Sequence, residues 1–260
     1  MYEDFYSKTI RDLLSRGLLS TDMKILIICA GELDKNTFLD LGFSDVTISN
    51  LDERMDERLY LPYKWSFQNA ENLTYDDNEF DYTIVHAGLH HCRSPHRAML
   101  EMYRVSKNGI IVFETRDNLL IKISKKFNLV EDYEISAVAC NDYKYGGVKN
   151  TQIPNYVYRW TENEVRKTIK SFAPEGRHKF IFYYGLQLPY DRIKLSKNKF
   201  KIFLAKAIFP IIKLLSIIFR KQCNQFCFFI IKPKYPNDLY PWLELRDDKI
   251  SINKDFISNK

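Results

Sequence analysis

The residues best suited to chemistry lie close together in the chain, where four histidines and a cysteine fall between residues 86 and 96. They are His86, His90, His91, Cys92 and His96. Their spacing does not match the paired ligands of a closed four-ligand zinc site, so we expect no bound metal. Histidine suits removal of a proton near neutral pH. We therefore take His90 or His91 as a catalytic base, with a purely structural role for both as the alternative.

The stretch that must position these histidines begins with residues 23–29, a continuous apolar run typical of a strand buried on both faces. Gly31 follows in a tight turn, residues 34–41 have a helical pattern, and a second strand begins at Val46. The charged residues 52–58 that follow this strand are predicted to form a helix. This is one βαβ unit, which gives a parallel sheet. Ligands of such sheets sit beyond the carboxyl ends of the strands, so we expect the functional site at residues 30–34 and 50–52.

Composition limits the class of protein. The five cysteines are scattered, which argues against a disulfide framework and favours a reducing cytoplasm. No secretory signal is visible in the first ten residues. Residues 196–260 hold 13 Lys or Arg and 5 Asp or Glu, so the formal net charge of +6 comes from this last part of the chain. We therefore expect no nucleic-acid partner, because a protein that binds nucleic acid would carry a basic groove beside the site.

Residues 70–114, AENLTYDDNEFDYTIVHAGLHHCRSPHRAMLEMYRVSKNGIIVFE, resemble the class I S-adenosylmethionine-dependent methyltransferases of the small-molecule type. The similarity covers residues 23–114 specifically. VTISNLDERM and GLHHCRSPHRAMLEMYRV further resemble a bacterial subgroup associated with polysaccharide biosynthesis. One departure is the glycine motif after the first strand, in which Gly31 remains but Cys29 and Leu33 stand where glycines are usual.

The resemblance implies an α/β fold, a Rossmann-like, doubly wound, mostly parallel seven-stranded sheet with an auxiliary insertion and an extra apolar helix between the last two strands. Strand and helix alternate along residues 23–114 as such a fold requires. We divide the chain into a cofactor-binding core, an acceptor-recognition insertion with a helix, closing strands with the apolar helix, and a polar tail. Their bounds are 1–135, 136–175, 176–235 and 236–260.

S-adenosylmethionine is the implied cofactor, and its residues are assigned by position. Asn50 and Asp52 follow the second strand, where a ribose diol finds its acceptor, although Asp52 as a helix cap is an equal alternative. Adenine specificity in the family comes from the residues after the third strand, and the resemblance places His90 and His91 beside the sulfonium. The predicted cofactor-binding residues are Ala30, Gly31, Glu32, Asn50, Asp52, Asn69, Ala70, Glu71 and His86.

The segment after residue 115 is rich in aromatic and amide side chains, which suit a sugar. We expect Arg116, Tyr143, Tyr156 and Trp160 to bind the acceptor, with core packing as the alternative for each. The expected reaction is methyl transfer to a hydroxyl of a sugar, glycan or other small molecule. An RNA methyltransferase and a non-catalytic binding module with this fold are the alternatives.

Residues 199–221 form a separate feature, an apolar helical stretch with Lys199, Lys206, Lys213 and Arg220 on one stripe. Lysines within the stretch argue against a membrane-spanning helix. Two interpretations stay open. The helix packs on the protein or pairs two subunits in a homodimer, or it lies in a membrane interface with its basic residues toward the headgroups. The second would place a cytoplasmic protein peripherally at the inner membrane face.

Overall fold

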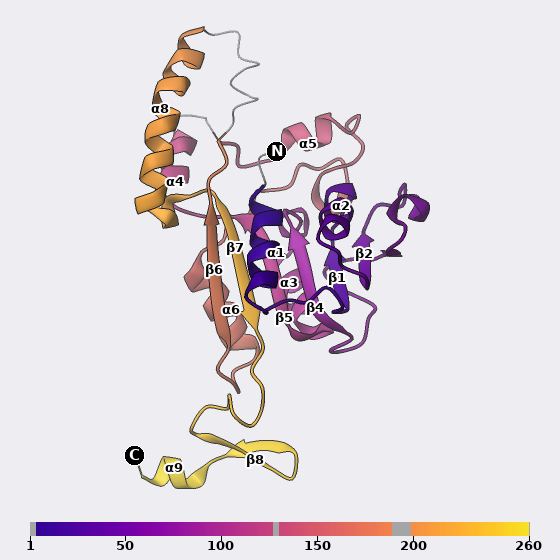
Figure 1. The fold of residues 1–260 in the computed structure, drawn as a ribbon, viewed down its shortest axis with the longest axis vertical. Helices are drawn as coiled ribbons and strands as arrows, with labels where there is room; N and C mark the ends of the chain where they lie inside the picture. Colours follow the sequence, from indigo (N-terminus) through magenta and orange to yellow (C-terminus); the bar gives the residue numbers. More distant parts are fainter. Residues whose placement is uncertain (1–3, 127–129, 189–198, 260) are drawn as a thin grey trace.

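A seven-stranded sheet runs through the computed structural model, which describes residues 4–126, 130–188 and 199–259, with the backbone alone for residues 199–208 (Figure 1). The strand order is β3-β2-β1-β4-β5-β7-β6, and β7 alone runs antiparallel to its neighbours. The expected mostly parallel, Rossmann-like sheet is confirmed. The strands are β1 (Ile25–Ile28), β2 (Val46–Asn50), β3 (Lys64–Phe67), β4 (Phe80–His86), β5 (Ser106–Thr115), β6 (Lys179–Gly185) and β7 (Gln225–Ile231).

Helices cover both faces of the sheet. The helical elements are α1 (Phe5–Ser15), α2 (Glu32–Asp40), η1 (Glu57–Tyr60), η2 (Leu89–His91), α3 (Pro95–Val105), α4 (Leu119–Lys126), α5 (Ile135–Ala139), η3 (Val148–Asn150), α6 (Glu162–Phe172), α8 (Lys199–Ile218), η4 (Arg220–Gln222) and α9 (Lys254–Ser258). Two begin as their sequences predict. The hydroxyl of Ser94 accepts from the backbone N–H of Arg97, and that of Thr161 accepts from Glu164.

The core has two parts, one on each face of the sheet. On one face α1 and α2 bury Ile10, Leu13 and Phe38 against β1 and β4. On the other face α3 and α6 bury Met99 and Ile169 against the same sheet. All four residues of β1 are buried, which explains why its sequence is continuously apolar rather than alternating. This rigid sheet fixes the positions of the loops at its carboxyl edge.

The charged stretch after β2 differs from expectation. A helix was predicted over residues 52–58, but the chain makes turns there and only residues 57–60 are helical, as η1. The carboxylates of Asp52 and Asp56 each accept from the backbone N–H two residues later, from Arg54 and Arg58. Such local bonds compete with the helical ones and favour turns.

The last part of the chain contains more regular structure than its polar sequence suggests. The strands β8 (Leu243–Arg246) and β9 (Lys249–Ile252) pair as an antiparallel hairpin, which extends away from the body together with α9 (Figure 1). The apolar helix α8 stands between β6 and β7 in the chain, as predicted. Among the described residues, no helix is both long enough and apolar enough to cross a membrane.

Candidate active site

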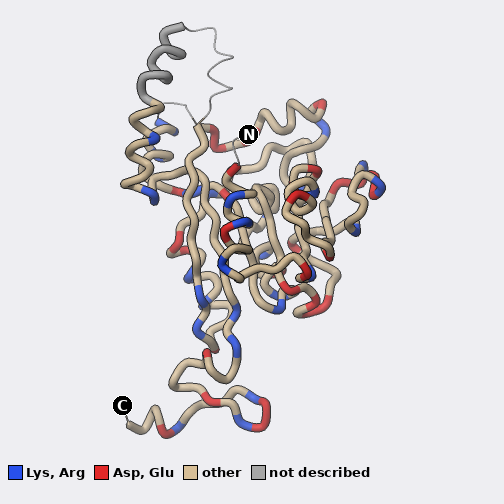
Figure 2. Tube along the Cα trace, in the orientation of Figure 1, with Lys and Arg blue, Asp and Glu red and all other residues tan. Residues whose placement is uncertain are grey.

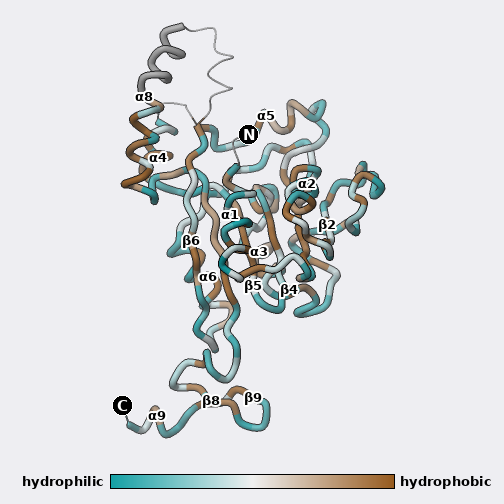
Figure 3. Tube along the Cα trace, viewed as in Figure 1, coloured by the Kyte–Doolittle hydropathy of each residue, from teal (hydrophilic) through white to brown (hydrophobic). Residues whose placement is uncertain are grey.

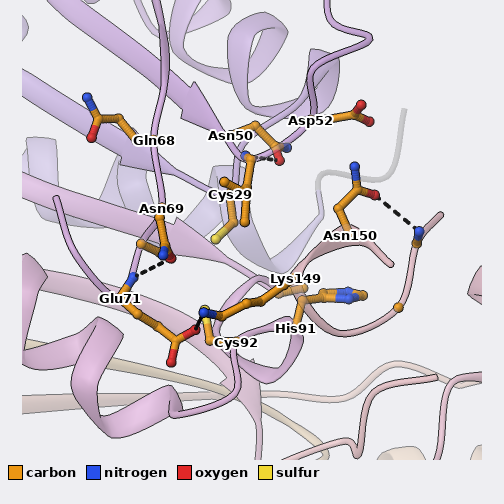
Figure 4. A pocket seen from close by; sticks show the side chains of 15 residues that line it. Cys29, Asn50, Asp52, Gln68, Asn69, Glu71, His91, Cys92, Lys149 and Asn150 are labelled. Carbon is orange, nitrogen blue, oxygen red and sulfur yellow. Dashed lines mark hydrogen bonds and ion pairs between the residues drawn. The ribbon is translucent and has the colours of Figure 1, made fainter. Parts of the chain in front are cut away.

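A cavity of about 210 Å³ opens at the carboxyl edge of the sheet, where β1, β2 and β4 end (Figure 4). Residues 146–150, which contain η3, cover one side of it. The cavity is lined by Cys29, Asn50, Leu51, Asp52, Gln68, Asn69, Ala70, Glu71, Ala87, His91, Cys92, Gly146, Gly147, Lys149 and Asn150. The structure thus brings together six residues assigned from the sequence, namely Asn50, Asp52, Asn69, Ala70, Glu71 and His91.

The ends of β1 and β4 have unusual backbone conformations. Cys29 and Ala87 both lie in the left-handed region, each with a φ of 52°. Gly88 passes so close to β1 that a Cβ there would lie 2.4 Å from the Cβ of Cys29. Non-glycine residues hold such conformations at a cost of about 1–3 kcal/mol, and such strain clusters at functional sites. Gly31 is different, because nothing lies within 4 Å of an added Cβ and the space in front of it is open.

The three residues assigned to the first turn lie beside the cavity in the chain but are not among its lining residues. Ala30 is buried, and its carbonyl accepts from Asn50 Nδ2 at 2.9 Å, which ties the end of β2 to the end of β1. The N–H of Gly31 donates to the Asp34 carboxylate at 2.9 Å, as the N-cap of α2. Glu32 is the first residue of that helix and is exposed.

Asp52 lies at the cavity wall with its carboxylate bound by one arginine. Arg54 Nε donates to Asp52 Oδ1 at 2.8 Å and Arg54 Nη2 to Oδ2 at 2.6 Å, and the guanidinium stacks on Tyr145 at 3.9 Å. These hydrogen bonds lower the pKa of Asp52, so it is ionised at neutral pH. A buried, ionised carboxylate at the end of β2 is positioned to accept from hydroxyl groups of a ligand once Arg54 moves aside.

The loop after β3 forms the opposite wall. Asn69 Oδ1 accepts from the N–H of Glu71 at 3.1 Å, so this side chain stabilises a turn. The Glu71 carboxylate accepts from the backbone N–H of Ser94 at 2.9 Å and pairs with Lys149 Nζ at 3.4 Å. Figure 4 shows Lys149 reaching Glu71 from the covering segment. This ion pair occupies the part of the cavity where the resemblance places the adenine of the cofactor.

The two adjacent histidines belong to η2 and have different surroundings. His90 is buried, and its Nδ1 lies 2.7 Å from Oε2 of Glu114, while the other carboxylate oxygen of Glu114 accepts from the N–H of Leu89. Glu134, the residue before α5, places Oε2 at 3.4 Å from Nε2 of both His90 and His91. His91 is partly exposed and lines the cavity.

These surroundings move the two imidazole pKa values apart. Burial alone would lower the pKa of His90, but the carboxylates of Glu114 and Glu134 outweigh it and raise the pKa to about 10. Burial and the positive charge on His90 lower the pKa of His91 from 6.5. The hydrogen bond from His90 lowers the pKa of Glu134 to about 2. At neutral pH, His90 is therefore a cation between two carboxylates and His91 is a neutral ring.

Within residues 4–126, 130–188 and 209–259, His90, His91 and Glu134 are also the one group of histidine, cysteine and acidic side chains whose ligand atoms converge, all within 4.8 Å of one another. A metal there would have to displace the proton that two carboxylates stabilise on His90. The expectation of no bound metal stays a prediction.

Sequence reasoning did not identify Glu114, Glu134, Arg54 and Lys149 as parts of the site. Glu114 ends the apolar strand β5, and a charged residue at the carboxyl end of a buried parallel strand is a signal that could have found it. The other three carry no comparable signal. Lys149 has a left-handed backbone conformation with a φ of 51°, which its sequence does not predict.

Five remaining assignments lie away from the cavity. His86 stacks on Tyr6 of α1 with ring centroids 4.3 Å apart, on the opposite face of the sheet from α3. Arg116 is buried and pairs with Glu162 at 2.6 Å, and Trp160 is fully buried against the core. The acceptor-side tyrosines, Tyr143 and Tyr156, are exposed and do not line the cavity.

Known proteins resemble this chain in sequence and in fold. Residues 30–113 match the family model described as a methyltransferase domain. The chain is 28% identical over 123 residues to a demethylmenaquinone methyltransferase of Geobacillus sp. strain WCH70, over 42% of this chain and 53% of that protein. It is 24% identical over 210 residues to the ubiquinone/menaquinone biosynthesis C-methyltransferase UbiE of Citrobacter koseri, over 68% of this chain and 80% of that protein.

The chain spans about half the length of the demethylmenaquinone methyltransferases that it matches. Among solved structures, the YcgJ protein of Bacillus subtilis has the same fold, with a TM-score of 0.54 and 13% identity over 89% of this chain and 100% of that one. The domain match begins in the turn after β1 and ends within β5, so it includes the loops at the carboxyl edge of the sheet that line the cavity between residues 50 and 92. Residues 30–113 of the chain therefore match a methyltransferase domain, and the sheet that contains them has the fold of the YcgJ protein.

Proposed function

We propose that the cavity binds S-adenosylmethionine and that the protein transfers its methyl group to a hydroxyl of a small acceptor beside His91. The observation that carries this proposal is the pairing of an ionised carboxylate at the end of β2 with a neutral imidazole at the mouth of β4, both facing one cavity. Nucleoside cofactors of parallel sheets bind at such an edge.

The residues present fit the cofactor. Asp52 is ionised and can accept from ribose hydroxyls, Asn50 lies next to it, and the open space before Gly31 gives a ligand access to the backbone. The cavity of about 210 Å³ is smaller than the roughly 300–1,000 Å³ of typical ligand sites. Lys149 lines the cavity and pairs with Glu71, and Arg54 occupies the Asp52 carboxylate, so both side chains must move when the cofactor binds.

The chemistry divides between the cofactor and the two histidines. S-adenosylmethionine supplies an electrophilic methyl group on a positively charged sulfur. His91 is neutral at neutral pH and takes the proton of the acceptor hydroxyl. The Glu134 oxygen at 3.4 Å from His91 Nε2 stabilises the positive charge that then forms on this ring. His90 keeps its own proton and holds Glu134 in place through its Nε2, also at 3.4 Å.

For the acceptor, we propose a sugar or glycan hydroxyl in polysaccharide biosynthesis in the cytoplasm, following the sequence resemblance. A second candidate is carbon methylation of a quinone-type ring, which the names of the matched quinone methyltransferases support at 24–28% identity. Both reactions remove a proton from the acceptor, so one base serves either. Nuclear magnetic resonance of the methylated product distinguishes an O-methyl from a C-methyl group.

Cofactor binding is the first test, and the chain offers a matched control. Asp52 and Arg54 in the cavity wall have a near copy four residues later, where Asp56 pairs with Arg58 at the same 2.6 Å on the exposed surface. Isothermal titration with S-adenosylhomocysteine should show binding that Asp52→Asn weakens by about tenfold to a hundredfold, as a lost charged hydrogen bond predicts. Asp56→Asn should bind like the wild type. No binding up to millimolar ligand would refute the proposal.

A further inference from the structure

The helices α4 and α8 expose an apolar surface at the end of the sheet where the active site lies. Nine large apolar residues there are between 42% and 69% exposed, which we call the α4–α8 surface. They are Leu119, Leu120, Ile123, Ile211, Leu214, Leu215, Ile217, Ile218 and Phe219. Figure 3 shows the hydrophobic colouring on both helices. Monomeric soluble proteins rarely expose apolar patches larger than a few hundred Å², and larger ones mark interaction sites.

A groove of about 400 Å³ runs between the two helices within this surface. Its walls are the side chains of Leu119, Leu120, Leu186, Ile212, Leu215 and Phe219, with Ser216 and Gln222 as the polar members. No titratable side chain is among its lining residues. Such a groove suits a hydrocarbon chain rather than a polar metabolite.

The charged residues that α4 and α8 themselves carry have one sign. Residues 199–221 contain six Lys or Arg and no Asp or Glu, and residues 119–126 contain three Lys and no acid. Figure 2 shows blue but no red along the described part of α8. Two of the α4 lysines have acidic partners from neighbouring segments, Lys122 with Asp117 and Lys125 with Asp132. Lys126, Lys213 and Arg220 are exposed beside the apolar residues.

This charge pattern decides between the two occupants that could cover the surface. A twofold dimer would place the surface of one copy against the same surface of the other, so two basic rims would face each other and repel. An anionic bilayer attracts each basic residue near its surface and accepts the apolar residues between them. The basic residues within residues 199–221 favour the headgroup region over the hydrocarbon core.

We propose that the α4–α8 surface docks the protein on an anionic lipid bilayer, with the groove holding a lipid chain. The helix α4 begins five residues after Glu114, the counter-ion of His90, so the docked surface adjoins the active-site edge. Figure 1 shows α8 and α5 beyond the end of the sheet where the parallel strands finish. Docking would therefore bring a membrane-borne acceptor to the side of the protein where the cavity opens.

Vesicle flotation of the full chain tests the docking independently of any methyl transfer. The protein should float with vesicles of phosphatidylcholine and phosphatidylglycerol and not with phosphatidylcholine alone, and high salt should weaken the binding. The triple variant Leu214→Glu, Ile217→Glu and Ile218→Glu changes exposed positions and should bind at least tenfold more weakly. Leu59→Glu, at an exposed apolar position in η1, should bind like the wild type.

A second variant keeps the test valid if the triple variant fails to fold. Phe219→Trp adds an indole at an exposed edge of the surface, and its fluorescence should shift to the blue and be quenched by brominated lipid when anionic vesicles are added. Absence of flotation and of quenching would overturn the proposal. A wild-type dimer that the triple variant dissociates, without vesicle binding, would assign the surface to a second copy instead.

Discussion

Replacing Glu114 by glutamine should destabilise the fold and let His90 lose its proton near neutral pH. Glu114 is 5% exposed, and its two carboxylate oxygens accept from the N–H of Leu89 and from His90 Nδ1, each at 2.7 Å. Glutamine keeps the size and one acceptor oxygen but has no charge. The buried imidazolium then loses the nearer of its two counter-ions and keeps only Glu134.

The size of the effect follows from the pKa of His90. A rise from 6.5 to about 10 corresponds to about 5 kcal/mol in favour of the charged ring in the folded protein. Glu134 supplies part of this, so the Glu114→Gln change should lower the free energy of unfolding by about 3 kcal/mol near pH 6. Because the folded pKa lies above the unfolded one, this stabilisation is complete below pH 6.5. It is lost as the pH rises to about 10, where wild type and variant should converge.

Urea unfolding at pH 6, 8 and 10 measures this difference, and the ring nitrogen signals of His90 in nuclear magnetic resonance follow its protonation directly. Glu131→Gln, which changes an exposed acid near the covering segment, is the control and should leave both quantities unchanged. A wild-type His90 that titrates near 6.5, or a Glu114→Gln variant as stable as the wild type at pH 6, would refute this account of the pair.

Three further changes test the site. His91→Phe should lower kcat by about a hundredfold to ten-thousandfold with little effect on S-adenosylhomocysteine affinity. In the wild type, kcat should rise with pH below 6.5, through the lowered pKa of His91, and a flat profile would contradict the base. Lys149→Ala should tighten cofactor binding up to about fivefold in calorimetry, because it removes the competing pair with Glu71, whereas weaker binding would make Lys149 a cofactor ligand. Gly88→Ala should lower the free energy of unfolding by about 1–3 kcal/mol in urea, since its Cβ would meet that of Cys29, and a neutral effect would contradict this close approach.

The sheet could be predicted from the sequence because its strands are buried on both faces. The run of β1 and residues 226–231 of β7 are apolar without interruption, and helices α3 and α6 begin at clear caps, Ser94 and Thr161. The helix predicted over residues 52–58 does not form because two Asp side chains accept from nearby backbone N–H groups. These bonds compete with the helical backbone bonds, and neither charge nor helix propensity reveals this competition.

The part of the site that lies at the carboxyl ends of parallel strands was predictable from the sequence. Asn50, Asp52 and His91 line the cavity because each comes shortly after a parallel strand. Contacts between distant segments were not predictable in this way. The pairs of His90 with Glu134 and of Glu71 with Lys149 join residues that are far apart in the chain, and the covering segment has no periodic pattern to place it. Trp160 illustrates the opposite error, since an aromatic residue beside a polar segment is fully buried.

The departure of the glycine motif from its family is consistent with the alternative of a non-catalytic module, and the structure weakens that argument. Glycine serves a nucleotide-binding turn by allowing a left-handed backbone and by leaving room for the ligand. Here Cys29 adopts the left-handed conformation itself, at a φ of 52°, and Gly31 leaves open space before the helix. Folding must then offset a strain of about 1–3 kcal/mol at Cys29. Because both physical contributions of the lost glycines are present, the motif's departure from its family does not by itself remove the cofactor site.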